Sequence, residues 1–146
     1  MKIRAGKLLF GAIAVLWANV VSATPAAADE GWVIDSFHSD IQIAADSSLT
    51  VTEDIRVDFG SLQKHGIFRT IPVKARYDSS HARHYGFNLE SVTDGSKPVP
   101  HELSGDAYND TIKIGDPNST VSGTQRYVIT YRYSGVMNAF SDHDEL

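Results

Sequence analysis

Apolar and polar residues alternate with a period of two along most of the chain after residue 30. In the segment LTVTEDIRVDF one face carries the apolar residues Leu49, Val51, Ile55, Val57 and Phe59, and the other face carries polar residues. This pattern predicts a β-strand with one buried face. Similar alternation occurs in GWVIDSFHSDIQIA, HYGFNLESV, DTIKIG and QRYVITYRYS. Turn-forming residues at 45–48, 93–96 and 115–119 separate these segments.

Strands at this spacing predict an all-β fold. We expect about seven of them in an antiparallel β-sandwich with an immunoglobulin-like layout. No segment after residue 28 keeps an apolar period of 3.6 residues over three helical turns. A chain of 146 residues has room for one such domain with its own core, plus a targeting segment.

The first 28 residues are typical of a secretory signal peptide. They begin with basic residues, continue with an apolar run from Leu8 to Val21, and end in small residues that permit cleavage after Ala23 or after Ala28. The run is shorter than the ~20 residues that cross a bilayer as a helix, so we expect cleavage rather than anchoring. Residues 29–146 are then an exported, extracytoplasmic domain.

Charge narrows the range of partners. After the signal segment, 10 basic side chains stand against 18 acidic ones, a net charge of −8. A surface this acidic repels phosphates, so we expect neither nucleic acid nor anionic lipid as a partner of the domain. The chain has no cysteine, which excludes a thiol nucleophile and cysteine-ligated zinc.

Two features of the apolar strand faces have a structural and a functional interpretation. Glu53 is the one charged residue among the apolar positions of its strand, a place typical of a strand end or a bulge edge, with a functional site as the alternative. Tyr127, Tyr131 and Tyr133 alternate along another strand. We expect them to face the core, although a strip for stacking sugars is the alternative.

The sequence contains only incomplete versions of known catalytic and metal-binding motifs. His101 and Glu102 lack the second histidine of a zinc-protease helix, and His81 and His84 lack an obvious third ligand. The segment that begins at Asp116 lacks the glycine and the glutamate of a calcium loop, and is better interpreted as a hairpin turn. We therefore predict no enzymatic activity, no catalytic residue, no cofactor and no bound metal.

Two local clusters carry the remaining candidate residues. One is His65 with Arg69 in QKHGIFRTIP, and the other lies in FSDHDEL. The acidic–histidine cluster of the second segment consists of Asp142, His143, Asp144 and Glu145. An arginine near such a cluster forms a buried ion pair or grips an anionic ligand, and two unrelated surface loops are the third interpretation.

Arg69 is the charged residue from which we expect the largest effect, as a structural clamp. Ile67 and Phe68 before it are expected to point into the domain, and Pro72 restrains the following backbone to an extended shape. The stem of Arg69 would then lie on apolar surface while its guanidinium binds a carboxylate. The candidate partners are Glu53 and the acidic–histidine cluster.

Three segments resemble the N-terminal domain of the predicted membrane-protein family called domain of unknown function 2207. They are WVIDSFHSDIQIAADSSLTVTEDIRVDF, HGIFRTIP and IKIGDPNSTVSGTQRYVITYRYSGVMNAFSDHDEL. The resemblance implies an exported β domain followed by membrane-spanning helices, and it carries no established enzymatic activity. The function expected is non-catalytic binding, sensing or assembly, with a protein or glycan partner. A glycan- or metal-binding module, or a hydrolase, that uses the acidic–histidine cluster is the alternative.

The last four residues, HDEL, match an endoplasmic-reticulum retrieval signal. In the family pattern this stretch is interior, so we expect the sequence to continue in the natural protein. A luminal resident with a signal peptide and a retrieval signal is the alternative.

Overall fold

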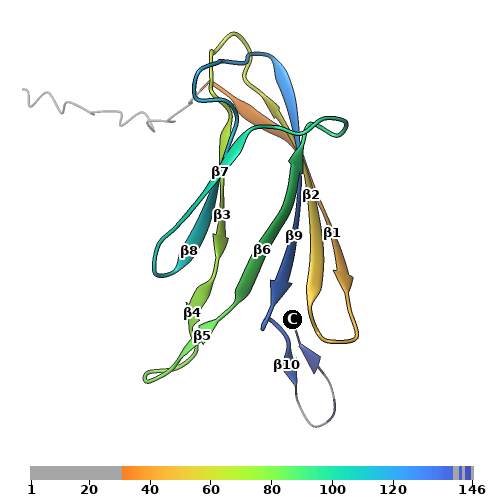
Figure 1. Cartoon of the computed structure of the whole chain (residues 1–146), viewed down its shortest axis with the longest axis vertical. Coiled ribbons are helices and arrows are strands. Elements are labelled where there is room, and N and C mark those ends of the chain that lie inside the picture. The colour runs from red at the N-terminus through yellow and green to blue at the C-terminus, as the bar shows by residue number, and fades with distance from the viewer. Residues whose placement is uncertain (1–30, 140–141, 143, 146) are drawn as a thin grey trace, which may run out of the picture.

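The structure is a computed structural model that describes residues 31–139, 142, 144 and 145. The expected signal peptide lies outside these residues. The described residues form strands and no helix (Figure 1). The strands are β1 (Val33–Ile43), β2 (Leu49–Asp58), β3 (Ile67–Pro72), β4 (Lys74–Arg76), β5 (Ala82–His84), β6 (Gly86–Thr93), β7 (His101–Gly105), β8 (Asn109–Ile114), β9 (Thr124–Ser134), β10 (Asn138–Ala139) and β11 (Asp144–Glu145).

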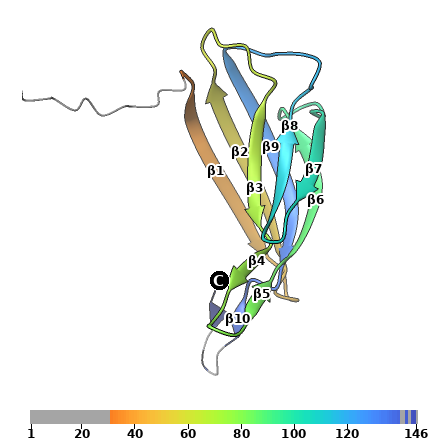
Figure 2. The ribbon, with the colours of Figure 1, turned by 90° about the vertical axis from the view of Figure 1, so that its left-hand side faces the viewer.

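The longer strands form two antiparallel sheets that face each other (Figures 1 and 2). The first sheet has the order β1-β2-β9-β6 and the second has the order β3-β8-β7. Two short hairpins, β4 with β5 and β10 with β11, lie at one end of the molecule (Figure 2). The prediction of an all-β, antiparallel sandwich is confirmed. The described longer strands divide into four and three, as in a seven-stranded immunoglobulin domain, but their order differs: the last of them, β9, pairs with β2 in the four-stranded sheet, where an immunoglobulin domain has its fifth strand.

The core forms where the predicted alternation is strongest. In β2 and the residue after it, the positions from Leu49 to Phe59 alternate between buried and more exposed side chains, as predicted. The second sheet contributes Ile71, Ile112 and Ile114 to the same cluster. Full burial of an aliphatic side chain stabilises a fold by about 1.5–3 kcal/mol, so this cluster is the main favourable term that holds the sheets together.

The tyrosines of β9 face this core. Tyr127 and Tyr131 are 4 % and 6 % exposed, and Tyr133 is partly buried against the cluster. The core-facing interpretation of these residues is therefore confirmed, because buried rings cannot present a flat surface to a sugar.

Aspartates form the turns that the sequence predicts. The carboxylate of Asp94 accepts hydrogen bonds from the backbone N–H groups of Ser96 and Lys97. These bonds lower the pKa of Asp94. The segment after Asp116 is also a turn, but the expected hairpin is wrong, because it leads from β8 in the second sheet to β9 in the first.

A close approach of two backbones fixes the start of β3. Gly66 has φ +138°, and a Cβ on it would lie 1.8 Å from the carbonyl oxygen of Ile114. Gly115 is constrained in the same way by the carbonyl oxygen of His65. Glycine is therefore required at both positions. The register that follows pairs Ile67 with Ile114.

The orientation of Phe68 differs from the expectation. Ile67 is partly buried against the core, whereas Phe68 is 71 % exposed on the other face of β3. Successive side chains of a strand point to opposite faces, so the two residues cannot both point inward. The inward positions of β3 are Ile67, Arg69 and Ile71.

Strand β1 lies at the edge of the first sheet and is exposed along its whole length. Five of its apolar side chains, Val33, Ile34, Phe37, Ile41 and Ile43, are each 48–59 % exposed. The contacts that β3 makes with this strand leave each of the five about half exposed. Within the part of the chain that the structure describes, no helix is long and apolar enough to span a membrane.

Candidate functional site

Glu53 lies in the middle of β2, on the inner face of the first sheet. It is 2 % exposed, and the register between β2 and β9 is regular on both sides of it. The expectation that Glu53 marks a strand end or a bulge edge is therefore wrong. A buried carboxylate in a regular strand needs a compensating partner, because burial of an unpaired charge is costly.

Arg69 provides that partner from the second sheet. Its Nε donates a hydrogen bond to Oε2 of Glu53 at 2.7 Å, and its Nη2 donates to Oε1 at 2.6 Å. Its Nη1 donates to the backbone carbonyl oxygen of Thr70 at 2.7 Å. The two-pronged contact matches the planar fork of a guanidinium to a carboxylate. Of the two partners considered for Arg69, the structure shows Glu53.

Tyr131 completes a buried polar cluster, which we call the Glu53–Arg69–Tyr131 clamp. The hydroxyl group of Tyr131 donates a hydrogen bond to Oε1 of Glu53 at 3.0 Å. Both oxygens of the carboxylate are thus engaged. The clamp links β2 and β9 of the first sheet to β3 of the second.

The pKa values in the clamp are shifted in the directions that this geometry dictates. The hydrogen bond to Glu53 raises the pKa of Arg69, although partial burial opposes this effect. Burial, and then the negative charge of Glu53, raise the pKa of Tyr131 well above its usual value. At neutral pH the guanidinium is therefore charged and the phenol is protonated, so the clamp has a fixed set of donors and acceptors.

The clamp lies in the wall of a cavity of about 660 Å³ with aromatic walls. The ring of Phe37, on β1, lies 5.8 Å from the guanidinium carbon of Arg69, a cation–π distance. Tyr133, which also lines the cavity beside Tyr131, donates a hydrogen bond to the carbonyl oxygen of Pro72, and burial raises the pKa of Tyr133 to about 12. A cavity of this kind suits an apolar ligand or side chain.

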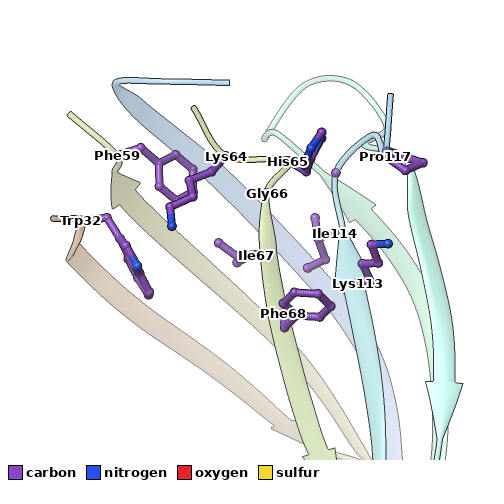
Figure 3. A pocket seen from close by; sticks show the side chains of 11 residues that line it. Trp32, Phe59, Lys64, His65, Gly66, Ile67, Phe68, Lys113, Ile114 and Pro117 are labelled. Carbon is purple, nitrogen blue, oxygen red and sulfur yellow. The ribbon is translucent and has the colours of Figure 1, made fainter. Parts of the chain in front are cut away.

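His65 lies near the other end of the sandwich, beside a separate cavity of about 570 Å³ (Figure 3). Its Nδ1 is 3.2 Å from the carbonyl oxygen of Asp116 and 2.9 Å from that of Ser119. Because carbonyl oxygens only accept, Nδ1 carries the proton. His65 therefore ties the chain before β3 to the segment after β8, and it does not belong to the clamp.

The acidic–histidine cluster is described in part. Asp144 and Glu145 form β11, which pairs with Asn138 and Ala139 of β10. Asp142 is exposed, and His143 lies outside the described residues. Among the described residues, no group of three or more histidines and carboxylates could hold a metal ion.

Sequence reasoning missed Tyr131 as a partner of Glu53, and it missed Arg83. Arg83 donates hydrogen bonds to the carbonyl oxygens of Gly135, at 2.8 Å, and Met137, and to the side-chain oxygen of Asn138. It therefore ties the β4–β5 hairpin to the segment before β10. No local signal reveals either contact, because the partners lie more than fifty residues apart.

Fold and site together define an antiparallel β-sandwich domain with a buried polar clamp between its sheets and an exposed edge strand, β1. A family model described as the N-terminal domain of a predicted membrane protein, DUF2207, matches residues 33–146. The chain belongs to this family. No curated protein and no solved structure matches the chain.

Proposed function

We propose that the chain is a non-catalytic, extracytoplasmic module of a membrane protein and that it serves in binding, sensing or assembly. Membership in a family of predicted membrane proteins supports the association with a membrane. The signal-like sequence of residues 1–28 supports export of the domain.

One observation carries the non-catalytic assignment. Glu53, the carboxylate that lines the largest of the cavities described here, has both oxygens engaged by Arg69 and Tyr131. A general base needs a free lone pair within reach of a substrate proton, and a nucleophile needs a free oxygen. Three donors hold this carboxylate between the sheets and only 2 % of Glu53 is exposed, so little of it can approach a substrate, and the role that we assign to it is to hold the two sheets together.

The rival is a glycan- or metal-binding module, or a hydrolase, that uses the acidic–histidine cluster. A thermal-shift screen of the purified protein with divalent metals and with a glycan library separates the two, because a ligand that binds the native state raises its melting temperature. We expect no shift with either set. A shift that Asp142→Asn abolishes would overturn the proposal in favour of the rival.

A further inference from the structure

We infer that β1 is a strand-addition site, at which an extended segment of a partner protein pairs with the free edge of the first sheet. The segment would carry apolar side chains on one face and basic side chains on the other. This inference rests on the proposed function, since it names the surface and the chemistry of a binding or assembly module.

β1 differs from the other edge strands in having a long stretch, from Ser36 to Ile43, without a device that blocks pairing; its one register shift lies before this stretch, between Ile34 and Ser36. On β3, Arg69 and Tyr133 already occupy the carbonyl oxygens of Thr70 and Pro72, and Pro72 has no N–H group. β6 is interrupted by a register shift between Leu89 and Ser91, and β7 has five residues. Natural edge strands are protected by such devices against unwanted pairing.

The free edge of β1 is long and regular. From Ser36 to Ile43 its register with β2 has no irregularity, and this stretch contains neither proline nor lysine. In the part of the chain that the structure describes, β2 is its one neighbouring strand. A partner strand would find a row of unpaired backbone groups along this stretch, which is the basis of strand addition.

The side chains of β1 specify an apolar face in the partner. Phe37 pairs with Ile55 and Ile41 pairs with Val51, so both share the inner face of the first sheet with buried residues. Yet each of the two is about half exposed. A partner strand with apolar residues on this face would cover both side chains. Every second residue of that strand would point to this face, because side chains alternate between the two faces of a strand.

The outer face of β1 specifies basic residues in the partner. Asp54, on the outer face of the sheet, already has a cationic partner, because Arg126 of β9 binds it at 2.6 Å, and His38 of β1 lies opposite Asp54 in the register. Asp40, which lies opposite Thr52 on this face, forms no ion pair with a lysine or arginine of the described residues. A lysine or arginine on the next strand would pair with it and would also be attracted by the net charge of −8.

The same charges argue against a second copy of this chain as the occupant. β1 contains two aspartates and no lysine or arginine. Two β1 strands side by side would therefore bring carboxylates together, on two domains that repel each other.

Titration with three synthetic eight-residue peptides tests the inference. The first alternates valine with lysine, the second alternates valine with glutamate, and the third is the first with N-methyl groups on the backbone nitrogens of its pairing edge. We expect the valine–lysine peptide to bind at least about tenfold more tightly than either of the others, because both backbone pairing and charge are required. Equal binding of all three, or binding of none, would overturn the inference.

A charge reversal locates the site. Asp40→Lys should lower the affinity for the valine–lysine peptide by roughly five- to tenfold and should raise the affinity for the valine–glutamate peptide. Glu102→Lys, an exposed residue of the edge strand β7, changes the net charge equally and should have little effect. If Glu102→Lys weakens binding as much as Asp40→Lys, the peptide responds to net charge and β1 is not its site.

Sedimentation of the unliganded protein tests whether a second copy of this chain occupies β1 instead. We expect a monomer. A dimer that Ile41→Ser dissociates would assign β1 to a second copy and would overturn the inference. Absence of peptide binding, in a protein whose melting temperature does not respond to metals or glycans, would refute the strand-addition site alone. A metal or glycan whose effect Asp142→Asn abolishes would instead refute the proposed function.

Discussion

Arg69 and Glu53 join the two sheets of the sandwich through two parallel hydrogen bonds, of 2.7 Å and 2.6 Å. The carboxylate is almost fully buried, while the arginine side chain keeps 30 % of its surface exposed. The pair is therefore a one-sided clamp, with its carboxylate in the core and its guanidinium at the wall of a cavity. Removal of Arg69 leaves a buried carboxylate without its counter-ion, whereas removal of Glu53 leaves an unpaired guanidinium that is partly exposed. The two mutations therefore differ in their effect on stability.

Arg69→Ala should destabilise the fold by about 3–5 kcal/mol, because it leaves the carboxylate of Glu53 buried without a counter-ion. Arg69→Lys should recover part of this loss, since an ammonium group cannot make both contacts. Denaturant midpoints measure the two effects. Arg126→Ala is the matched control, because Arg126 makes the same two-pronged contact with Asp54 on the exposed outer face, and it should change the midpoint little. A full-stability Arg69→Ala protein would show that the clamp does not hold the sheets.

Replacement of the whole clamp by apolar residues should restore most of the stability. In the triple variant Glu53→Leu, Arg69→Met, Tyr131→Phe no polar group of the clamp remains, so no buried donor or acceptor loses its partner. We expect its free energy of unfolding to lie within about 1–2 kcal/mol of the parent, well above that of Arg69→Ala. If the triple variant is the less stable of the two, the clamp contributes more than the compensation of its own charges.

Alkaline pH should weaken the fold over a defined range. Burial raises the pKa of Tyr133 to about 12 and also raises that of Tyr131, whereas an unfolded tyrosine titrates near a pKa of about 10. The unfolded state therefore loses protons first, so the stability from these groups is complete below pH ~10 and is lost as the pH rises toward ~12.

Urea midpoints between pH 8 and pH 12 would measure this loss. Tyr133→Phe should make the decline shallower, because the phenol that titrates has gone. Tyr108→Phe, at a tyrosine that is 56 % exposed, serves as the control and should leave the profile unchanged. The same slope in the parent and in Tyr133→Phe would exclude Tyr133 as a source of the alkaline loss.

Arg83→Ala should loosen one end of the molecule without unfolding it. Arg83 binds the carbonyl oxygens of Gly135 and Met137 together with Asn138, whereas the core lies elsewhere. Hydrogen exchange should accelerate several-fold at residues 135–139 and stay unchanged in β2 and β9. Arg76→Ala is the control, because Arg76 bonds within its own hairpin, to the carbonyl oxygen of Asp78. Uniform acceleration over the whole chain would instead place Arg83 among the residues that support global stability.

The alternation of apolar and polar residues was enough to predict the class of the fold and the inner face of its main strands. The alternation from Leu49 to Phe59, and that from Tyr127 to Tyr131, reappear as buried faces, because a strand has a period of two and apolar side chains leave water. The alternation also singled out Glu53 as a charged exception, and the residues next to Arg69 led us to expect a carboxylate partner for it. Both predictions depend only on neighbouring residues, so they could be made from the sequence.

Which residues contact each other depends on the packing of the two sheets and could not be predicted from the pattern. The approach of Arg69 to Glu53 depends on how the second sheet lies over the first, and the approach of Tyr131 depends on the pairing of β2 with β9. The exposure of β1 is of the same kind: its apolar residues alternate with polar ones as in β2, yet at the edge of the first sheet Phe37 and Ile41 each stay about half exposed. Periodicity defines the two faces of a strand, but it carries no information on what lies against each face.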